Sequence, residues 1–79
     1  FKIKKYYKKE MKKLTAKSPF ADWLNDRLGK KAVSEVLTED QIEGIGFFKD
    51  WPIYRLHFFA AEQVSLEEIE EIIDIYQDL

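Results

Sequence analysis

The sequence predicts an all-α or strongly α-dominated domain, a compact bundle of about five short helices, and three observations support this. Residues that favour helix N-termini recur along the chain, at Ser18-Pro19, Thr38 and Ser65. Apolar residues recur between them at the spacing of amphipathic helices. The 79 residues include only three Gly and two Pro, and 46% are hydrophobic, which suffices for one small core. We therefore expect residues 1–79 to form a single small domain.

Residues 1–17 are expected to form a basic amphipathic helix that packs on the domain or on a partner protein. In a helix over residues 3–16, the apolar side chains share one narrow stripe, formed by Ile3, Tyr7, Met11 and Leu14. Eight lysines and one glutamate occupy residues 1–17, and the lysines would cover most of the remaining helix surface. Because the first residues also alternate, a short strand through Phe1 and Ile3 is the competing interpretation.

A second helix is expected over about residues 19–28. Ser18 can accept a hydrogen bond from a free first-turn amide, and Pro19 suits the first helical position. Gly29 is interpreted as the residue that ends this helix. The apolar side chains between these signals share one side, at Phe20, Trp23, Leu24 and Leu28.

Two capping boxes predict two further helices. In this motif a Ser or Thr and a Glu or Gln three residues later bond to each other's backbone amides. Thr38 with Gln41 predicts a helix that begins near Glu39. Ser65 with Glu68 predicts the last helix, whose apolar face comprises Leu66, Ile69, Ile72, Ile73, Tyr76 and Leu79. Four carboxylates form a stripe on its opposite face: Glu67, Glu71, Asp74 and Asp78.

The segment "GIGFFKDWPIYRLHFFAAEQ", residues 44–63, fits two structures. One is a β-hairpin at about residues 45–60, favoured by aromatic and β-branched residues, which would make the fold α+β. The other is a helix capped by Asp50, with Pro52 in its first turn, that continues to Val64. We favour the helix, because a lone hairpin would leave two open edges. Its clustered aromatic rings are expected to form the core, with Trp51 as an exposed anchor.

The sequence indicates no catalytic residues, no metal ligands and no cofactor, so we expect a protein that is not an enzyme. There is no cysteine, and the single histidine, His57, is interpreted as a hydrogen-bonded core or boundary residue. The acidic stripe of the last helix is interpreted as a solvated face. Gly44-Ile45-Gly46 lacks the third glycine of a dinucleotide-binding motif.

The charges suggest two classes of function. Residues 1–17 carry a net charge of +7 and residues 18–79 a net charge of −9. We expect a protein-interaction module, which could be an adaptor, an inhibitor or a subunit, with a homodimer as its simplest form. The alternative is nucleic-acid binding through residues 2–17. The candidate binding surface comprises Lys4, Lys5, Lys8, Lys9, Lys12, Lys13, Tyr6 and Trp51.

We expect no membrane span, because no apolar run approaches the roughly 20 residues that a transmembrane helix needs. The N-terminal residues also lack the apolar core and cleavage pattern of a secretory signal. These features, together with the absence of cysteine, lead us to expect a cytoplasmic protein.

Overall fold

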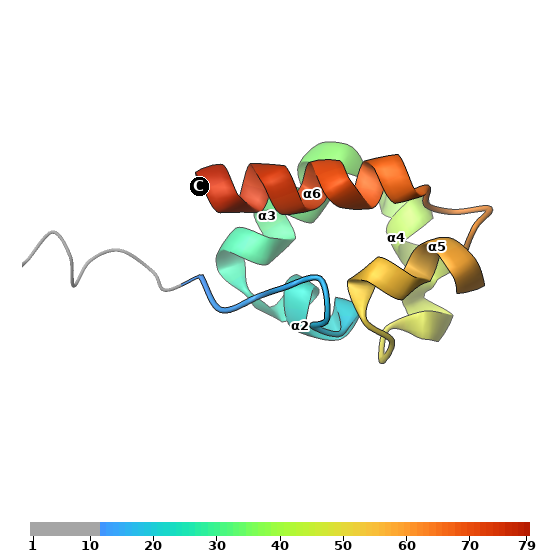
Figure 1. The fold of residues 1–79 in the computed structure, drawn as a ribbon. Helices are drawn as coiled ribbons and strands as arrows, with labels where there is room; N and C mark the ends of the chain where they lie inside the picture. Colours follow the sequence, from blue (N-terminus) through green and yellow to red (C-terminus); the bar gives the residue numbers. More distant parts are fainter. Residues whose placement is uncertain (1–11) are drawn as a thin grey trace, which may run out of the picture.

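The computed structural model describes residues 12–79, and this part of the chain is a small helical bundle, as predicted (Figure 1). Residues 12–79 contain five α-helices, two 3₁₀ turns and no β-strand, so the hairpin alternative for residues 45–60 is wrong. The elements, in chain order, are α2 (Phe20–Asn25), α3 (Arg27–Val36), α4 (Glu39–Ile45), η1 (Gly46–Phe48), η2 (Ile53–Arg55), α5 (Leu56–Phe59) and α6 (Leu66–Asp78).

Both predicted capping boxes are present. At the start of α4, the Thr38 hydroxyl accepts from the Gln41 amide at 3.2 Å, and Gln41 Oε1 accepts from the Thr38 amide at 2.9 Å. At the start of α6, the Ser65 hydroxyl and Glu68 Oε1 accept reciprocally, at 3.2 and 2.9 Å. These bonds satisfy amides that a helix leaves free in its first turn, which explains where α4 and α6 begin.

The predicted helix over residues 19–28 is wrong at its C-terminal end. The helix is interrupted at Asp26. The Asp26 Oδ2 atom accepts a hydrogen bond from the Gly29 amide at 2.9 Å, so a new helix begins at Arg27. Gly29 lies buried inside α3 rather than after a helix. A Cβ atom there would lie 2.6 Å from the Trp23 carbonyl oxygen, so Gly29 allows α2 and α3 to approach closely.

The core lies between α6 and the pair α2 and α3, with residues from the other elements completing it. α6 packs along α3, and α2 packs against α3 (Figure 1). The Trp23 and Tyr76 rings meet edge to face, with centroids 4.9 Å apart. The buried apolar residues are Leu14, Phe20, Trp23, Ala32, Val33, Leu37, Ile45, Ile53, Leu56, Ala60, Val64, Ile69, Ile72 and Tyr76.

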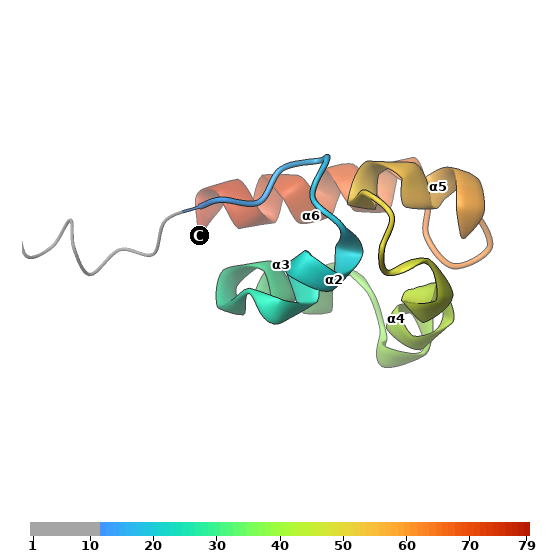
Figure 2. The same cartoon turned by 90° about the horizontal axis from the view of Figure 1, so that it is seen from below.

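Residues 12–18, which we call the strap, are extended chain and a turn (Figure 2). The predicted basic helix is therefore wrong for residues 12–16, and residues 1–11 lie outside the described part of the chain. The strap forms hydrogen bonds within its own turn, where the Ser18 amide donates to the Thr15 carbonyl at 3.0 Å, and it also bonds to other elements. The Leu14 amide donates to the Tyr76 hydroxyl at 3.2 Å, and Trp23 Nε1 donates to the Thr15 carbonyl at 3.2 Å. Lys12 Nζ donates to the Gln77 carbonyl at 2.6 Å, where cations favour a helix C-terminus.

Residues 49–54 lie beside residues 16–21, held by backbone hydrogen bonds. Ile53 donates to the Ser18 carbonyl at 2.9 Å, and Tyr54 donates to the Ala16 carbonyl at 3.1 Å. In the other direction, Phe20 donates to the carbonyl of Trp51 at 3.0 Å. This pairing holds the turn at residues 49–51 against the start of α2, up to Pro52, the residue before η2.

The helix predicted for residues 50–64 is therefore shorter than expected. It begins after Pro52 and not with a cap from Asp50, because residues 49–52 form a turn that pairs with residues 19–21. η2 continues directly into α5, which ends before Ala60 rather than at Val64. At the C-terminal end of α5, the Ala60 amide donates to the Leu56 carbonyl, and the Ala60 carbonyl accepts from the Val64 amide.

Candidate protein interface

Six aromatic side chains come from η1, the following turn, η2 and α5: Phe47, Phe48, Trp51, Tyr54, Phe58 and Phe59. Five of them line two adjoining hollows, and we call these five the aromatic surface: Phe48, Trp51, Tyr54, Phe58 and Phe59. The expectation that the six rings form the core is wrong, since Phe47 is 93% exposed and Phe58 is 68% exposed. Trp51 is 40% exposed, which confirms its predicted place at the surface.

The sequence contained a signal for this exposure. Once residues 53–60 are helical, Ile53, Leu56 and Ala60 share one face at the spacing i, i+3 and i+7, and these three residues are buried. Tyr54 and Phe58 then fall on the other face. The aromatic residues of the core come from α2 and α6 instead: Phe20, Trp23 and Tyr76.

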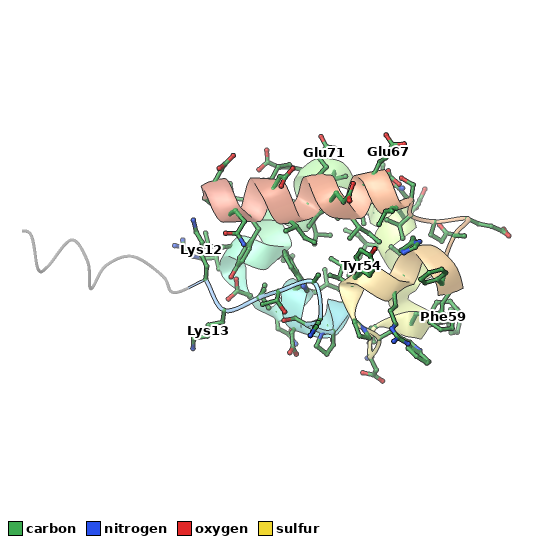
Figure 3. The ribbon with its side chains drawn as sticks, in the orientation of Figure 1. Lys12, Lys13, Tyr54, Phe59, Glu67 and Glu71 are labelled. Atoms are coloured by element: carbon green, nitrogen blue, oxygen red, sulfur yellow. The ribbon has the colours of Figure 1, made fainter. Side chains whose placement is uncertain are left out.

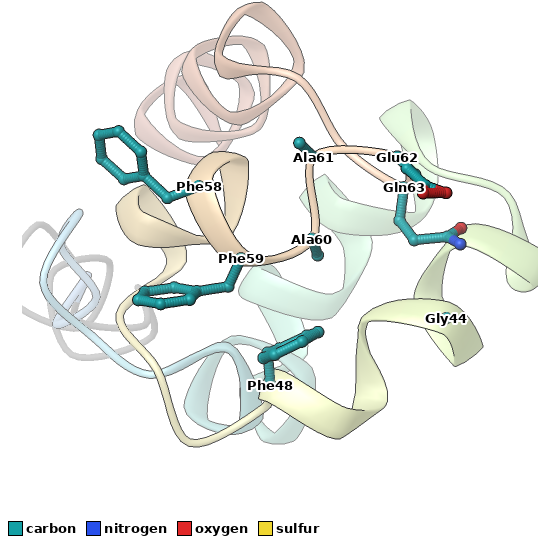
Figure 4. A pocket seen from close by; sticks show the side chains of 8 residues that line it. All are labelled: Gly44, Phe48, Phe58, Phe59, Ala60, Ala61, Glu62 and Gln63. Carbon is teal, nitrogen blue, oxygen red and sulfur yellow. The ribbon is translucent and has the colours of Figure 1, made fainter.

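A groove of about 760 Å³ lies between the strap and the aromatic surface. Ala16 and Lys17 of the strap line it, and the other lining residues are Trp51, Pro52, Tyr54, Arg55, Phe58 and Phe59. We call this the aromatic groove. A second hollow, of about 370 Å³, shares Phe58 and Phe59 with it and extends to Phe48, Gly44 and residues 60–63 (Figure 4).

The rings of the aromatic surface brace one another. Phe59 faces Trp51, with centroids 4.3 Å apart, and also stacks with Phe48 at 6.2 Å. Figure 4 shows Phe59 turned toward Phe48, whereas Phe58 points away from it. Phe58 in turn packs on the His57 ring at 4.1 Å. Contacts among large, stiff side chains reduce the freedom that a binding event would otherwise remove.

The charges around the aromatic groove have one sign. Lys17 and Arg55 line it, both are exposed, and no carboxylate is among the residues that form it. The carboxylates Glu67 and Glu71 of α6 point away from the other helices, on the side of the molecule opposite Phe59 (Figure 3). The groove is therefore a locally cationic, apolar site on a chain whose net charge is −2.

The predicted site residues are not brought together. Lys12 is exposed beside the C-terminal end of α6, Lys13 is exposed and points away from α6, and Phe59 lies at the other end of the molecule (Figure 3). Trp51 lies in the aromatic groove, where its cationic neighbours are Lys17 and Arg55, which the sequence did not single out. The remaining predicted residues lie outside the described part of the chain: Lys4, Lys5, Tyr6, Lys8 and Lys9.

The acidic stripe of α6 and His57 occupy the places that the sequence indicated. Glu67, Glu71, Asp74 and Asp78 are all exposed, so the stripe is the solvent side of the helix. His57 is half-buried at the edge of the core, and its Nε2 atom is buried without a hydrogen-bond partner among the described residues. Residues 12–79 contain no cluster of three or more His, Asp and Glu side chains that could hold a metal ion.

None of the helices in residues 12–79 combines the length and the apolar character that crossing a bilayer requires. Comparison of the chain with protein-family models, with curated proteins and with solved structures finds no match.

Proposed function

We propose that this protein is a small, non-enzymatic protein-interaction module that binds a partner through the aromatic surface. The observation that carries the proposal is the exposure of several large rings side by side around a groove. Contiguous apolar surface of this kind on a small protein marks a binding site, since burying a Phe or Trp side chain contributes about 1.5–3 kcal/mol. Trp, Tyr and Arg, which dominate the energetics of protein interfaces, all line the groove.

Nucleic-acid binding is the alternative. Aromatic rings interleaved with cations suit single-stranded bases, and Lys17 and Arg55 flank the rings here. The charge of the surrounding chain opposes it, because residues 12–79 carry eight Lys and Arg against fourteen Asp and Glu, a difference of −6. The net negative charge of residues 12–79 would repel the phosphates of a long nucleic acid, whereas a short protein segment would contact only the groove.

Site-specific photo-crosslinking in cells that make the protein tests the proposal. Benzoylphenylalanine is placed at Phe58, on the aromatic surface, and in a separate variant at Glu71, on the acidic face of α6. We expect a discrete protein adduct from position 58 and none from position 71. Adding Trp51→Ala should reduce the adduct at position 58, because the variant removes a neighbouring anchor ring.

Each adduct has a distinct meaning. An adduct of twice the mass of the chain would identify the homodimeric form of the module. An adduct that nuclease removes would support nucleic-acid binding instead and contradict the proposal. Equal labelling from positions 58 and 71 would also contradict it, since no surface would then be selected.

A further inference from the structure

The aromatic groove is a half-open hollow whose volume and apolar lining suit a ligand. Its volume of about 760 Å³ falls within the range of about 300–1,000 Å³ that is typical of pockets for small ligands. Trp51, Tyr54 and Phe59 supply flat apolar area to its lining. Such a groove suits one or two apolar side chains from a short chain segment.

The lining of the groove is held in place in the unbound molecule. Ala16 of the strap is held to Tyr54 by a backbone hydrogen bond of 3.1 Å, and Ser18 is held to Ile53 by one of 2.9 Å. The Phe59 ring also packs on Trp51 in a tilted arrangement, with ring centroids 4.3 Å apart. A site that is formed in advance loses little conformational freedom on binding.

The charges select among possible occupants. Lys17 and Arg55 are the charged residues of the groove, and an Arg guanidinium matches a carboxylate in a bidentate geometry that adds specificity. Residues 1–11 of this chain carry five lysines and one glutamate, so their charge is of the wrong sign. A second copy could offer the acidic stripe of α6, but the apolar residues Ile69 and Ile72 of that helix are buried in its own core.

From these observations we infer that the aromatic groove binds a short acidic peptide segment, in which an apolar or aromatic anchor is flanked by carboxylates. The anchor packs on Trp51 and Phe59, and the carboxylates pair with Lys17 and Arg55. This inference rests on the proposed function and specifies the chemistry of the partner.

The test is a peptide-display selection in which the flanks and the central positions vary independently. The protein should enrich peptides with apolar or aromatic centres and acidic flanks. The variant Lys17→Glu/Arg55→Glu should keep the preference for the centre and reverse the preference for the flanks, from acidic to basic. Lys30→Glu/Lys31→Glu is the matched control, because it makes the same change of charge at exposed positions of α3 that do not line the groove.

The binding affinity of a labelled peptide from the enriched pool is then measured for the protein and for each variant. Its affinity should fall about three- to thirtyfold in Lys17→Glu/Arg55→Glu, as expected for two exposed ion pairs, and should fall with added salt. The control variant should change it less than about twofold. Circular dichroism of each variant confirms that the helices are retained.

The outcomes separate this inference from the proposed function. Enrichment of apolar peptides without any preference in the flanks, together with loss of binding in Trp51→Ala, would overturn the acidic-peptide inference and leave the interaction module standing. A failure to enrich any peptide over the bare support would overturn the inference, and the crosslinking at position 58 would then decide the proposed function alone. If the parent protein and Lys17→Glu/Arg55→Glu enriched peptides with the same flanks, the acidic-peptide inference would also be overturned.

Discussion

At the scale of single residues, the Tyr76 hydroxyl has a structural role that its position on an apolar helix face did not indicate. It accepts from the buried Leu14 amide at 3.2 Å, and so it joins α6 to the strap. Tyr76→Phe keeps the ring and its contact with Trp23 but leaves that amide without its partner. We expect a loss of about 1–3 kcal/mol in the free energy of unfolding, measured by urea denaturation.

Tyr54→Phe is the control for Tyr76→Phe. Tyr54 is 44% exposed, so water can solvate the groups around its hydroxyl, and the change should stay within about 0.5 kcal/mol. Equal losses in the two variants would show that the Tyr76 hydroxyl contributes nothing specific.

Gly29 is required by the close approach of α2 and α3. A Cβ atom at this position would lie 2.6 Å from the Trp23 carbonyl oxygen, which belongs to the backbone and has little room to move. Although Ala favours a helix over Gly by about 1 kcal/mol, we expect Gly29→Ala to destabilise the fold by about 1–3 kcal/mol, because the two helices must separate. Thermal unfolding followed by circular dichroism measures the effect.

Gly46 provides the matched comparison for Gly29. No atom lies within 4 Å of the place that its Cβ would take, and its backbone is in the right-handed helical region. Gly46→Ala should therefore leave stability unchanged or raise it by about 0.4–1 kcal/mol. If Gly29→Ala behaved in the same way, the packing role of Gly29 would be wrong.

At the scale of elements, the two capping boxes are connected through one side chain. Gln41 Nε2 donates to the Gln63 carbonyl at 2.7 Å and to Glu68 Oε2 at 3.3 Å. Gln41 also completes the cap of α4, while Glu68 completes the cap of α6. The first turns of two helices that are distant in sequence therefore share a hydrogen-bond network.

A double-mutant cycle tests this connection. Gln41→Glu removes the donor and places a carboxylate against Glu68, so we expect a loss of about 1–2 kcal/mol in unfolding free energy. Glu68→Gln added to that variant should recover part of the loss, because an amide then faces a carboxylate again. Urea denaturation of the four proteins measures the coupling, and strict additivity of the two changes would contradict it.

The sequence predicted elements well where the signals were local. The Thr38 and Ser65 caps located α4 and α6, because both partners of each capping box lie within three residues. The sequence-based prediction was wrong at residues 26–29. Asp26 caps a new helix there, and Gly29 is needed because its backbone packs closely against Trp23, a tertiary contact that local signals do not reveal. The strap was also mispredicted in part: its helical periodicity at Leu14 is outweighed by a partner on α6, 62 residues away.

At the scale of the whole molecule, the aromatic content was predicted to be internal because a small chain has few other ways to build a core. Three rings and eleven aliphatic residues suffice for the buried core of the described chain, which leaves the aromatic surface outside. Which of twelve aromatic residues become buried depends on how the helices pack. Composition alone could therefore not locate the candidate site, although Trp51 was correctly predicted to be exposed.

The place of the strap in the lining of the groove changes what counts as the smallest functional unit of this protein. A shortened chain that begins at Ser18 would contain the residues of every helix in the described structure, but it would lose the buried Leu14 side chain and the bonds from the strap to Tyr76 and Trp23. It would also lack Ala16 and Lys17, and with them part of the lining of the aromatic groove. Trimming the protein to its helices would thus yield a scaffold without its recognition site.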